Sequence, residues 1–386
     1  MYKRQLNVSL GFHVAILADL QGPKLRVGKM TNGTVVSVGQ EVIFTTDSVA
    51  LGTANAIYMN YKQFPKDVSA GERVLLDDGK LIFEVVETDK SSQVKARVIQ
   101  GGELKSNKGV NLPNTNISLP ALTDKDVKDA VFAIKQDVDW IALSFVRHKQ
   151  DVEDLRNLVQ KHGKNDIPII SKIEKPEALV NIKEIVKASN ALMVARGDLG
   201  VEVPAEEVPI VQKELVQHAK IARIPVIVAT QMMESMIDSL TPTRAEVNDV
   251  ANSVMDGADA VMLSGETSVG KYPVEVVQTM RRILVSVENS PLIQVPYKVP
   301  KKKNARFVTK SVCFHAATMA DEIEAKAICT LTNSGYTAYQ ISAWRPNASV
   351  LVFTSNPRIL AQLNLLWGVK GRLYDCLLYT SPSPRD

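Results

Sequence analysis

Residues 167–200, IPIISKIEKPEALVNIKEIVKASNALMVARGDLG, decide the fold of this chain. The segment contains an apolar run at 167–174, a helix-like pattern at 176–187 and a second apolar run at 191–196. Each run is apolar on both faces, which is typical of buried parallel strands. A strand, a helix and another strand in this order are the repeating unit of an α/β fold.

The same unit repeats on both sides of this segment. Further strand candidates lie at 14–19, 140–145, 225–230 and 260–265, and further helix candidates at 149–161, 205–222, 243–254 and 272–288. Thr243 stands three residues before Glu246, the spacing of a helix-capping box. Pro176 and Pro273 suit the first turns of their helices.

The ends of these strands favour a closed barrel over an open sheet. All six finish in polar residues: Asp19; Ser144; Lys172 and Glu174; Arg196 and Asp198; Thr230 and Gln231; Ser264 and Glu266. In a (β/α)₈ TIM barrel all strand ends meet at one active site, whereas an open sheet binds ligands only at its switch point. A barrel needs eight strands and six are visible, so we expect its first two units to be missing before Val14.

The predicted barrel comprises residues 12–28 and 121–290. Two other regions of the chain show a different pattern of strands and helices. Residues 29–120 contain short alternating segments divided by Gly and Asp turns, which predicts an inserted β-barrel lid domain. Residues 291–304 are rich in Pro and Lys and predict a linker. Strand and helix patterns resume at 305–371, which predicts a truncated C-terminal α/β domain.

Both ends of the chain lack these patterns. Residues 1–11 show no helix-capping pattern, and residues 372–386 end in a Ser-Pro repeat. We interpret both as non-native sequence flanking a fragment, and two frayed termini are the alternative.

Composition excludes several classes of protein. The 386 residues are 45% hydrophobic and 23% charged, as in an ordinary globular protein, and the net charge is only +4. No apolar run approaches the ~20 residues of a membrane span, and no basic stripe with aromatic residues suggests nucleic-acid binding. Three cysteines cannot form a disulfide framework, and without a secretory signal we expect a cytoplasmic protein.

Charged residues at neighbouring strand ends predict a metal site. Lys172 and Glu174 share one face of their strand because side chains alternate with period two. Asp198 follows one strand–helix unit later, so the two carboxylates should stand on neighbouring strands. Paired carboxylates with water and substrate oxygens are a usual way to hold Mg²⁺. A structural ion pair at 172–174 and a plain tight turn at 195–200 are the alternatives.

Hydroxyl and carboxyl groups at two further strand ends offer a proton route. Thr230, Ser264 and Glu266 could form a relay, although each alone could be an ordinary loop residue. The chain has no P-loop and no GxGxxG motif, so nucleotide binding cannot be argued from those patterns.

Several motifs, in their order and spacing, resemble the pyruvate kinase family over roughly residues 12–370. They are ADLQGPKLRVG, NKGVNLP, IISKIEKPEAL, MVARGDLGVEVP, ATQMMESM, PTRAEVNDVAN and DGADAVMLSGET. The resemblance implies a barrel interrupted by a lid and followed by an effector-binding domain. It also implies transfer of the phosphoryl group of phosphoenolpyruvate to ADP, giving pyruvate and ATP.

The resemblance assigns roles to individual residues. It implies that Lys172 faces the transferred phosphoryl group and that Glu174 and Asp198 bind Mg²⁺. The other implied contacts are Ala195, Arg196, Gly197, Asp198 and Thr230 for the substrate, Thr230, Ser264 and Glu266 for protonation, and Arg26, Asp78 and Lys108 for the nucleotide.

This chain departs from the family pattern before Asp19 and at Lys24. Family members carry an Arg and an Asn-x-Ser-His stretch upstream of Asp19 that help to bind the phosphate and a monovalent cation, and this chain has no such segment. Members that need K⁺ have Glu in a GPE motif where this chain has Lys24. We hypothesise that the Lys24 ammonium replaces the K⁺ charge, which puts the role of Asp19 in a monovalent-cation site in doubt.

The segment TNSGYTA at 332–338 resembles the loop that binds an effector phosphate in the family. Thr332, Ser334 and Thr337 would supply hydroxyl groups to a phosphorylated effector, and a plain helix cap is the alternative. The family also suggests a homotetramer.

Two other functions stay open. One is a Mg²⁺-dependent lyase or aldolase that handles a pyruvate enolate on a similar barrel, although such an enzyme is not expected to carry the lid. The other is a catalytically incompetent fragment, because a barrel that lacks two units exposes two strand edges.

Overall fold

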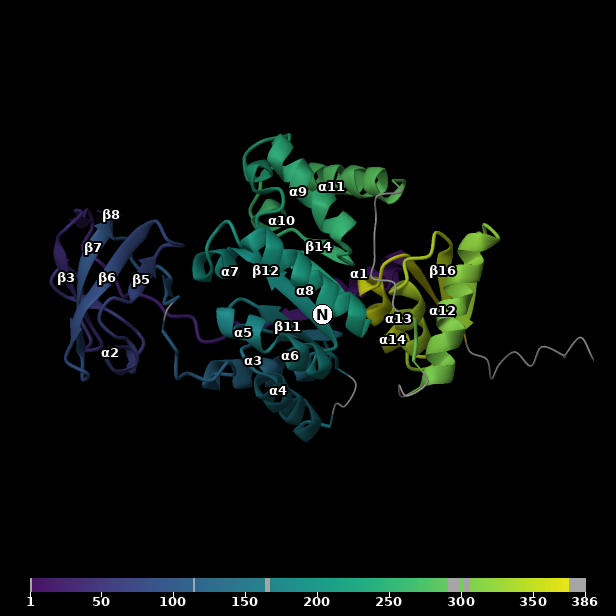
Figure 1. Cartoon of the computed structure of the whole chain (residues 1–386), viewed down its shortest axis with the longest axis horizontal. Coiled ribbons are helices and arrows are strands. Elements are labelled where there is room, and N and C mark those ends of the chain that lie inside the picture. The colour runs from purple at the N-terminus through teal and green to yellow at the C-terminus, as the bar shows by residue number, and fades with distance from the viewer. Residues whose placement is uncertain (1, 114, 164–166, 291–298, 302–305, 375–386) are drawn as a thin grey trace, which may run out of the picture.

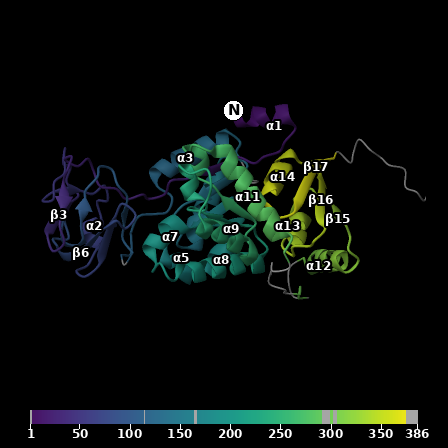
Figure 2. The same cartoon turned by 90° about the horizontal axis from the view of Figure 1, so that it is seen from above.

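The computed structural model describes residues 2–113, 115–163, 167–290, 299–301 and 306–374. Three bodies lie in a row along its longest axis, with the lid domain at one end, the parallel sheet and its helices in the middle, and the C-terminal domain at the other end (Figures 1 and 2). Most of the predicted linker at 291–304 and the predicted tail from 375 onward lie outside the described residues.

The central sheet contains the six predicted strands, all parallel. Its order is β1 (Leu17–Asp19), β10 (Trp140–Leu143), β11 (Ile169–Ile173), β12 (Ala191–Ala195), β13 (Val226–Ala229) and β14 (Ala260–Met262). This order follows the chain without reversal, as in a barrel and unlike a doubly wound sheet. Within the described residues β1 and β14 are edge strands that do not pair with each other. The eight-stranded closure therefore stays a prediction.

Helices connect successive strands and bury apolar residues against the sheet. They are α3 (Asp124–Lys135), α4 (Lys149–Lys161), α5 (Pro176–Val180), α6 (Ile182–Ala188), α7 (Arg196–Glu202), α8 (Val208–Ala222), η1 (Glu234–Ile237), α9 (Arg244–Asp256), α10 (Gly265–Ser268) and α11 (Pro273–Glu288). The predicted capping box of Thr243 and Glu246 is confirmed. The helix predicted at 176–187 is divided at Asn181, whose side-chain amide donates hydrogen bonds to the carbonyls of Arg147 and Glu177.

The lid domain is β-rich, as predicted. It contains β2 (Val35–Val36), β3 (Glu41–Thr45), β4 (Ile57–Tyr58), α2 (Phe64–Asp67), β5 (Arg73–Leu76), β6 (Leu81–Thr88), β7 (Gln93–Gln100), β8 (Gly102–Glu103) and β9 (Val110–Asn111). Six strands form one sheet in the order β4-β3-β7-β6-β5-β9, and β2 pairs with β8. Phe44 packs edge-on against Phe64 and Phe83, with ring centroids 5.9 and 5.3 Å apart, so the lid has its own core.

The C-terminal domain has a three-stranded parallel sheet in the order β15-β16-β17. Its elements are α12 (Phe307–Glu322), β15 (Ala327–Leu331), α13 (Tyr336–Ser342), β16 (Ser349–Thr354), α14 (Pro357–Gln362), η2 (Leu363–Leu365) and β17 (Val369–Leu373). Strand β17 continues past residue 372, where the sequence predicted the start of a tail. No helix in the described ranges is long and apolar enough to cross a membrane.

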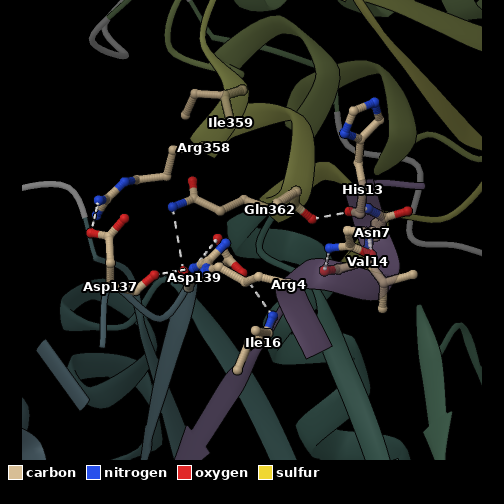
Figure 3. Close-up of polar contacts among 12 residues, drawn as sticks. Arg4, Asn7, His13, Val14, Ile16, Asp137, Asp139, Arg358, Ile359 and Gln362 are labelled. Atoms are coloured by element: carbon tan, nitrogen blue, oxygen red, sulfur yellow. Dashed lines mark hydrogen bonds and ion pairs between the residues drawn. The ribbon is translucent and has the colours of Figure 1, made fainter. Parts of the chain in front are cut away.

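The N-terminal segment forms a helix that the sequence did not predict, α1 (Tyr2–Leu10). The loop before β10 contacts both this helix and the C-terminal domain (Figure 3). Asp139 lies 3.5 Å from the Arg4 guanidinium, and its carbonyl lies 3.4 Å from the Gln362 amide. Arg358 forms an ion pair with Asp137. These partners are more than 130 residues apart in sequence, which local sequence patterns cannot reveal.

Buried charges also join the barrel to the C-terminal domain. Arg345 donates hydrogen bonds to the carbonyls of Gly257 and Ala258 at 2.6 and 2.5 Å. Beside it, Lys220 forms an ion pair with Asp259, and both side chains are only 2% exposed. This junction lies where β13 and β14 begin, at the opposite end of the sheet from the polar strand ends.

Candidate active site

Lys172 lies at the centre of the polar strand ends. Its ammonium is 3.2 Å from both the Asp19 and Glu174 carboxylates and donates a hydrogen bond of 2.8 Å to the Ser144 hydroxyl. The period-two prediction that Lys172 and Glu174 share a face is therefore correct. Burial lowers the pKa of Lys172, but the attraction of Glu174 and Asp19 outweighs it and leaves the pKa above its usual value.

Glu174 is a buried carboxylate whose two oxygens have different neighbours. The backbone N–H of Phe145 donates to Oε2 at 2.6 Å, and Phe145 adopts a positive φ of 54° at this turn. Oε1 receives no hydrogen bond, but it forms an ion pair of 3.2 Å with the Lys172 ammonium. The pKa of Glu174 is raised to about 7, chiefly by burial; Asp198 also raises it, whereas Lys172 and the Phe145 N–H lower it. A second cation beside Oε1 would further offset the cost of burying this charge.

Asp198 lies in the first turn of α7, directly after β12. It lines a cavity of about 510 Å³ together with Arg196, Gly197 and, from the lid, Asp78. The charge of Asp198 acts on Glu174, as expected for carboxylates from neighbouring strands. Lys172 and Glu174 are not among the residues that line this cavity, so one site shared by Lys172, Glu174 and Asp198 stays a prediction.

The two carboxylates fit a divalent metal. Mg²⁺ takes hard oxygen ligands and usually keeps waters and substrate oxygens beside one or two carboxylates. Glu174 Oε1, which receives no hydrogen bond, and the cavity position of Asp198 suit that requirement. Within the described ranges no cluster of three or more His, Cys, Asp or Glu side chains could hold a metal.

Hydrogen bonds connect three of the predicted substrate-binding residues, Arg196, Gly197 and Thr230. The Gly197 N–H donates a hydrogen bond of 2.8 Å to the Thr230 hydroxyl, and that hydroxyl donates to the carbonyl of Ala229 at 2.6 Å. Arg196 contacts Asp249 at 2.6 Å and the carbonyl of Thr230 at 2.7 Å. Thr230 has a φ of 71°, a conformation that is strained for a β-branched residue. The Gly197 N–H, expected to face a substrate carboxylate, is therefore occupied by Thr230 in this structure.

The predicted proton relay is not continuous in the described residues. The buried Glu266 carboxylate accepts hydrogen bonds from the backbone N–H groups of Ser264 at 2.7 Å and Met233 at 3.2 Å. No hydrogen bond joins the side chain of Thr230 to that of Ser264 or Glu266 in this part of the chain. The three residues lie at neighbouring strand ends without forming a chain.

The three predicted nucleotide contacts lie in different settings, and of the three only Asp78 is among the residues that line the cavity. Asp78 lines the 510 Å³ cavity, and Lys24 lines it with Asp78 from the barrel side. Lys108 forms an ion pair of 2.7 Å with Asp77, next to Asp78, and Arg26 donates a 2.8 Å hydrogen bond to the carbonyl of Asn107.

The predicted effector loop does not gather its three hydroxyl groups. Thr332 lines a small cavity of about 210 Å³ near β16. The Thr337 hydroxyl lies 3.0 Å from that of Thr330, beneath the turn at Gly335, whose φ is 76°. Ser334 is not among the residues that line this cavity.

Sequence reasoning missed a second layer of charged residues beside the site. Lys175 and Glu202 form a buried ion pair of 2.7 Å, and Asn111 of the lid donates to the same Glu202 oxygen at 3.0 Å. The Arg147 guanidinium donates hydrogen bonds to the carbonyls of Ile117 and Leu119, where the chain passes from the lid back to the barrel. The adjacency of Lys175 to Glu174 was the only signal in the sequence, because the partners lie far along the chain.

Comparisons with known proteins agree with this architecture. The family model described as pyruvate kinase, barrel domain, matches residues 2–277, and the one described as pyruvate kinase, alpha/beta domain, matches residues 310–381. A pyruvate kinase of Corynebacterium efficiens is 46% identical over 368 residues, which cover 95% of this chain and 76% of the relative. A pyruvate kinase of Mycobacterium tuberculosis is 44% identical with the same coverage.

A solved structure leads to the same family. The crystal structure of a pyruvate kinase from Cryptosporidium parvum superposes with a TM-score of 0.88 at 35% identity, covering 98% of this chain and 78% of the other. An identity of 35% over almost the whole chain indicates membership of the same family and not only a shared fold. This chain therefore belongs to the pyruvate kinase family of phosphotransferases.

Proposed function

We propose that this chain transfers the phosphoryl group of phosphoenolpyruvate to ADP, giving pyruvate and ATP. One observation carries the proposal: the Lys172 ammonium lies 3.2 Å from the buried Glu174 carboxylate, which is close enough to Asp198 for the charge of Asp198 to act on it, so that a cation could bind beside the two carboxylates. Phosphoryl transfer needs positive charge around three equatorial oxygens and little covalent chemistry from the protein. Family membership supports the same reaction.

Lys172 supplies a fixed positive charge to the migrating phosphoryl group. Its pKa lies above the usual value, so it stays protonated at neutral pH. Asp19, Glu174 and Ser144 fix its position before substrate binds. An ammonium that is already oriented costs no reorganisation during the reaction.

Glu174 and Asp198 would hold Mg²⁺. Bound there, the metal would supply positive charge against the negative charge that develops on the substrate. The protein supplies two carboxylates on rigid elements, and Phe145 N–H orients the Glu174 carboxylate through Oε2.

Thr230 would cap the substrate and help to protonate the enolate after phosphoryl transfer, with Ser264 and Glu266 in support. The Thr230 hydroxyl now accepts from Gly197 and donates to Ala229. Substrate would have to replace the bond from Gly197, which frees that N–H for the substrate carboxylate beside Ala195 and Arg196.

The lid would close over the nucleotide and exclude water. Asp78 of the lid lines the cavity together with Asp198, which supports this role, and we infer that Lys108 and Arg26 also contact the nucleotide. Water exclusion protects the reaction from hydrolysis of the substrate.

Lys24 would provide the charge that K⁺ supplies in other members. It lines the same two cavities as Asp198, which supports this role. Asp19, which pairs with Lys172, would then not need to bind a monovalent cation.

Assembly, regulation and location follow from the family alone. We expect a cytoplasmic homotetramer, with a phosphorylated effector bound by the loop of Thr332, Ser334 and Thr337. The absence of two barrel units before Val14 stays a prediction.

A coupled assay tests the proposed function. Lactate dehydrogenase and NADH report pyruvate formed from phosphoenolpyruvate, ADP and Mg²⁺, and a luciferase assay reports ATP from the same samples. Equal yields of pyruvate and ATP support the proposal. Pyruvate without ATP would favour the lyase, and neither product, with substrates in excess and a folded chain, would favour the incompetent fragment.

A further inference from the structure

A buried cluster beside the site has no role in the proposed reaction. Lys175 Nζ lies 2.7 Å from Glu202 Oε1, and the two side chains are only 7% and 1% exposed. Neither group touches Lys172, Glu174 or Asp198 through a recorded hydrogen bond or ion pair within the described residues. The cluster also borders a small cavity of about 30 Å³ lined by Asp198 and Asp78.

The two charges belong to the segments that carry the candidate metal ligands. Lys175 directly follows Glu174 at the end of β11. Glu202 stands four residues after Asp198 in α7, so the two side chains lie on the same face of that helix, one turn apart. The ion pair therefore links the end of β11, which carries Glu174, to helix α7, which carries Asp198.

Asn111 connects this pair to the lid. It lies in β9, which pairs with β5 of the lid sheet. Its amide donates a hydrogen bond of 3.0 Å to the same Glu202 Oε1 that accepts from Lys175. Movement of β9 away from the barrel must therefore break or lengthen a bond to the residue that holds α7.

The cluster is poorly explained by stability alone. A buried ion pair contributes little net stability, because desolvation of both charges offsets their attraction. Glu202 Oε2 is buried and receives no hydrogen bond within the part of the chain that the structure describes, which adds a further cost. Such an ion pair is better suited to fixing the relative positions of the two segments that carry its side chains.

We propose that Lys175 and Glu202 are positioning residues that set the separation of the Glu174 and Asp198 carboxylates, and that Asn111 makes this separation depend on the position of the lid. The inference rests on the proposed function, since it assumes that these two carboxylates hold the metal. Partners behind metal ligands typically change metal affinity 10- to 100-fold when they are removed.

Binding of Mn²⁺ alone, measured by electron paramagnetic resonance of the free ion, tests the pair without an activity readout. E202Q keeps the shape of the side chain and its acceptor for Asn111 but removes the charge. We expect Mn²⁺ to bind E202Q about 10- to 100-fold more weakly than the unchanged chain. K175M/E202L removes both charges without leaving one buried alone, and we expect the same loss with an unchanged melting temperature.

K220M is the matched control. Lys220 and Asp259 form an ion pair that is equally buried, at the opposite end of the sheet. We expect K220M to lower the melting temperature but to keep Mn²⁺ affinity within about twofold, because distant sites act independently. An equal loss of affinity in K220M would overturn the proposal, since the effect would then follow stability.

The lid connection is tested by a double-mutant cycle. If Asn111 acts through Glu202, N111A weakens Mn²⁺ binding of the unchanged chain, but N111A added to K175M/E202L, which lacks the acceptor oxygen, causes no further loss. Additive losses would contradict the connection.

E174Q separates failure of this inference from failure of the proposed function. If E174Q binds Mn²⁺ as the unchanged chain does, the proposed metal site is wrong. If E174Q loses binding while folded E202Q and K175M/E202L retain it, the metal site stands and the positioning role is refuted.

Discussion

Lys172, which is partly buried, and Lys220, which is fully buried, lie at opposite ends of the barrel strands, and their pKa values shift in opposite directions. At the polar strand ends, Glu174 and Asp19 raise the pKa of Lys172 despite its burial. At the junction with the C-terminal domain, burial lowers the pKa of Lys220 to about 8, because one carboxylate, Asp259, is opposed by the nearby Arg345. Lys172 therefore has two carboxylates beside it, whereas Lys220 has one carboxylate and one guanidinium.

The unpaired atoms at the two ends differ in the same way. Among buried side chains in the described ranges, the carboxylate oxygens without a hydrogen-bond partner are Glu174 Oε1 and Glu202 Oε2, both near the cavity under the lid. At the junction the unpaired atoms of Arg345 are donors, Nε and Nη1. Acceptors beside a cavity suit a cation, whereas donors packed between domains do not. The comparison distinguishes a binding site from a structural junction.

Replacement of Lys172 should give the largest effect. K172M removes the charge that faces the phosphoryl group, and we expect kcat to fall by about 10³–10⁵, the range found for a positive group that stabilises phosphoryl transfer. The coupled assay measures the loss. A variant with kcat within tenfold of the unchanged chain would mean that Lys172 is only a structural ion pair.

The corresponding change at the junction should affect stability instead. K220M removes the nearer ion-pair partner of the buried Asp259 and leaves only Arg345, 3.7 Å away, and we expect the free energy of unfolding to fall by about 3 kcal/mol. Urea denaturation followed by circular dichroism measures the change. If kcat of the folded variant fell as far as in K172M, the two ends would not differ in the way described.

Substitution at Lys24 should alter cation dependence. We expect the unchanged chain to be almost as active in tetramethylammonium chloride as in KCl. We expect KCl to raise the activity of K24E about tenfold or more, because a unit charge near a partly buried site contributes more than ~1.4 kcal/mol to the interaction with substrate. Strong activation of the unchanged chain by KCl would defeat the idea that its ammonium replaces K⁺.

The pH dependence of stability should reveal the lowered pKa of Lys220. Its pKa of about 8 in the folded chain is below the value of 10.5 expected when unfolded, so between these pH values the unfolded state binds more protons. The free energy of unfolding should therefore rise with pH across this window, by at most about 1.4 kcal/mol per pH unit. The difference between the unchanged chain and K220M isolates this term in urea titrations, and a flat difference would show that Lys220 keeps its proton.

Sequence periodicity predicted the features that depend on one strand or one crossover. Lys172 and Glu174 share a face because strand side chains alternate, and Asp198 acts on Glu174 because neighbouring parallel strands end together. The capping box at Thr243 was predicted because its partners lie three residues apart.

Features that depend on distant partners were not predicted. The helix at 2–10 contacts residues 137 and 139, and Glu202 meets Asn111 across 91 residues of sequence. The predicted helix at 176–187 divides because Asn181 bonds to a loop from another unit. The hydroxyls of Thr230 and Thr337 were expected to face ligands, but they bond within the chain, since rotamers respond to neighbours that sequence spacing does not specify.

Crystals of the chain soaked with Mn²⁺ and measured at the manganese absorption edge test the metal site most directly. The expected result is one strong anomalous peak between Glu174 Oε1 and the Asp198 carboxylate, within reach of the ligand atom that now receives no hydrogen bond. A peak bound elsewhere in the molecule, or no peak at a concentration that saturates binding in solution, would contradict it.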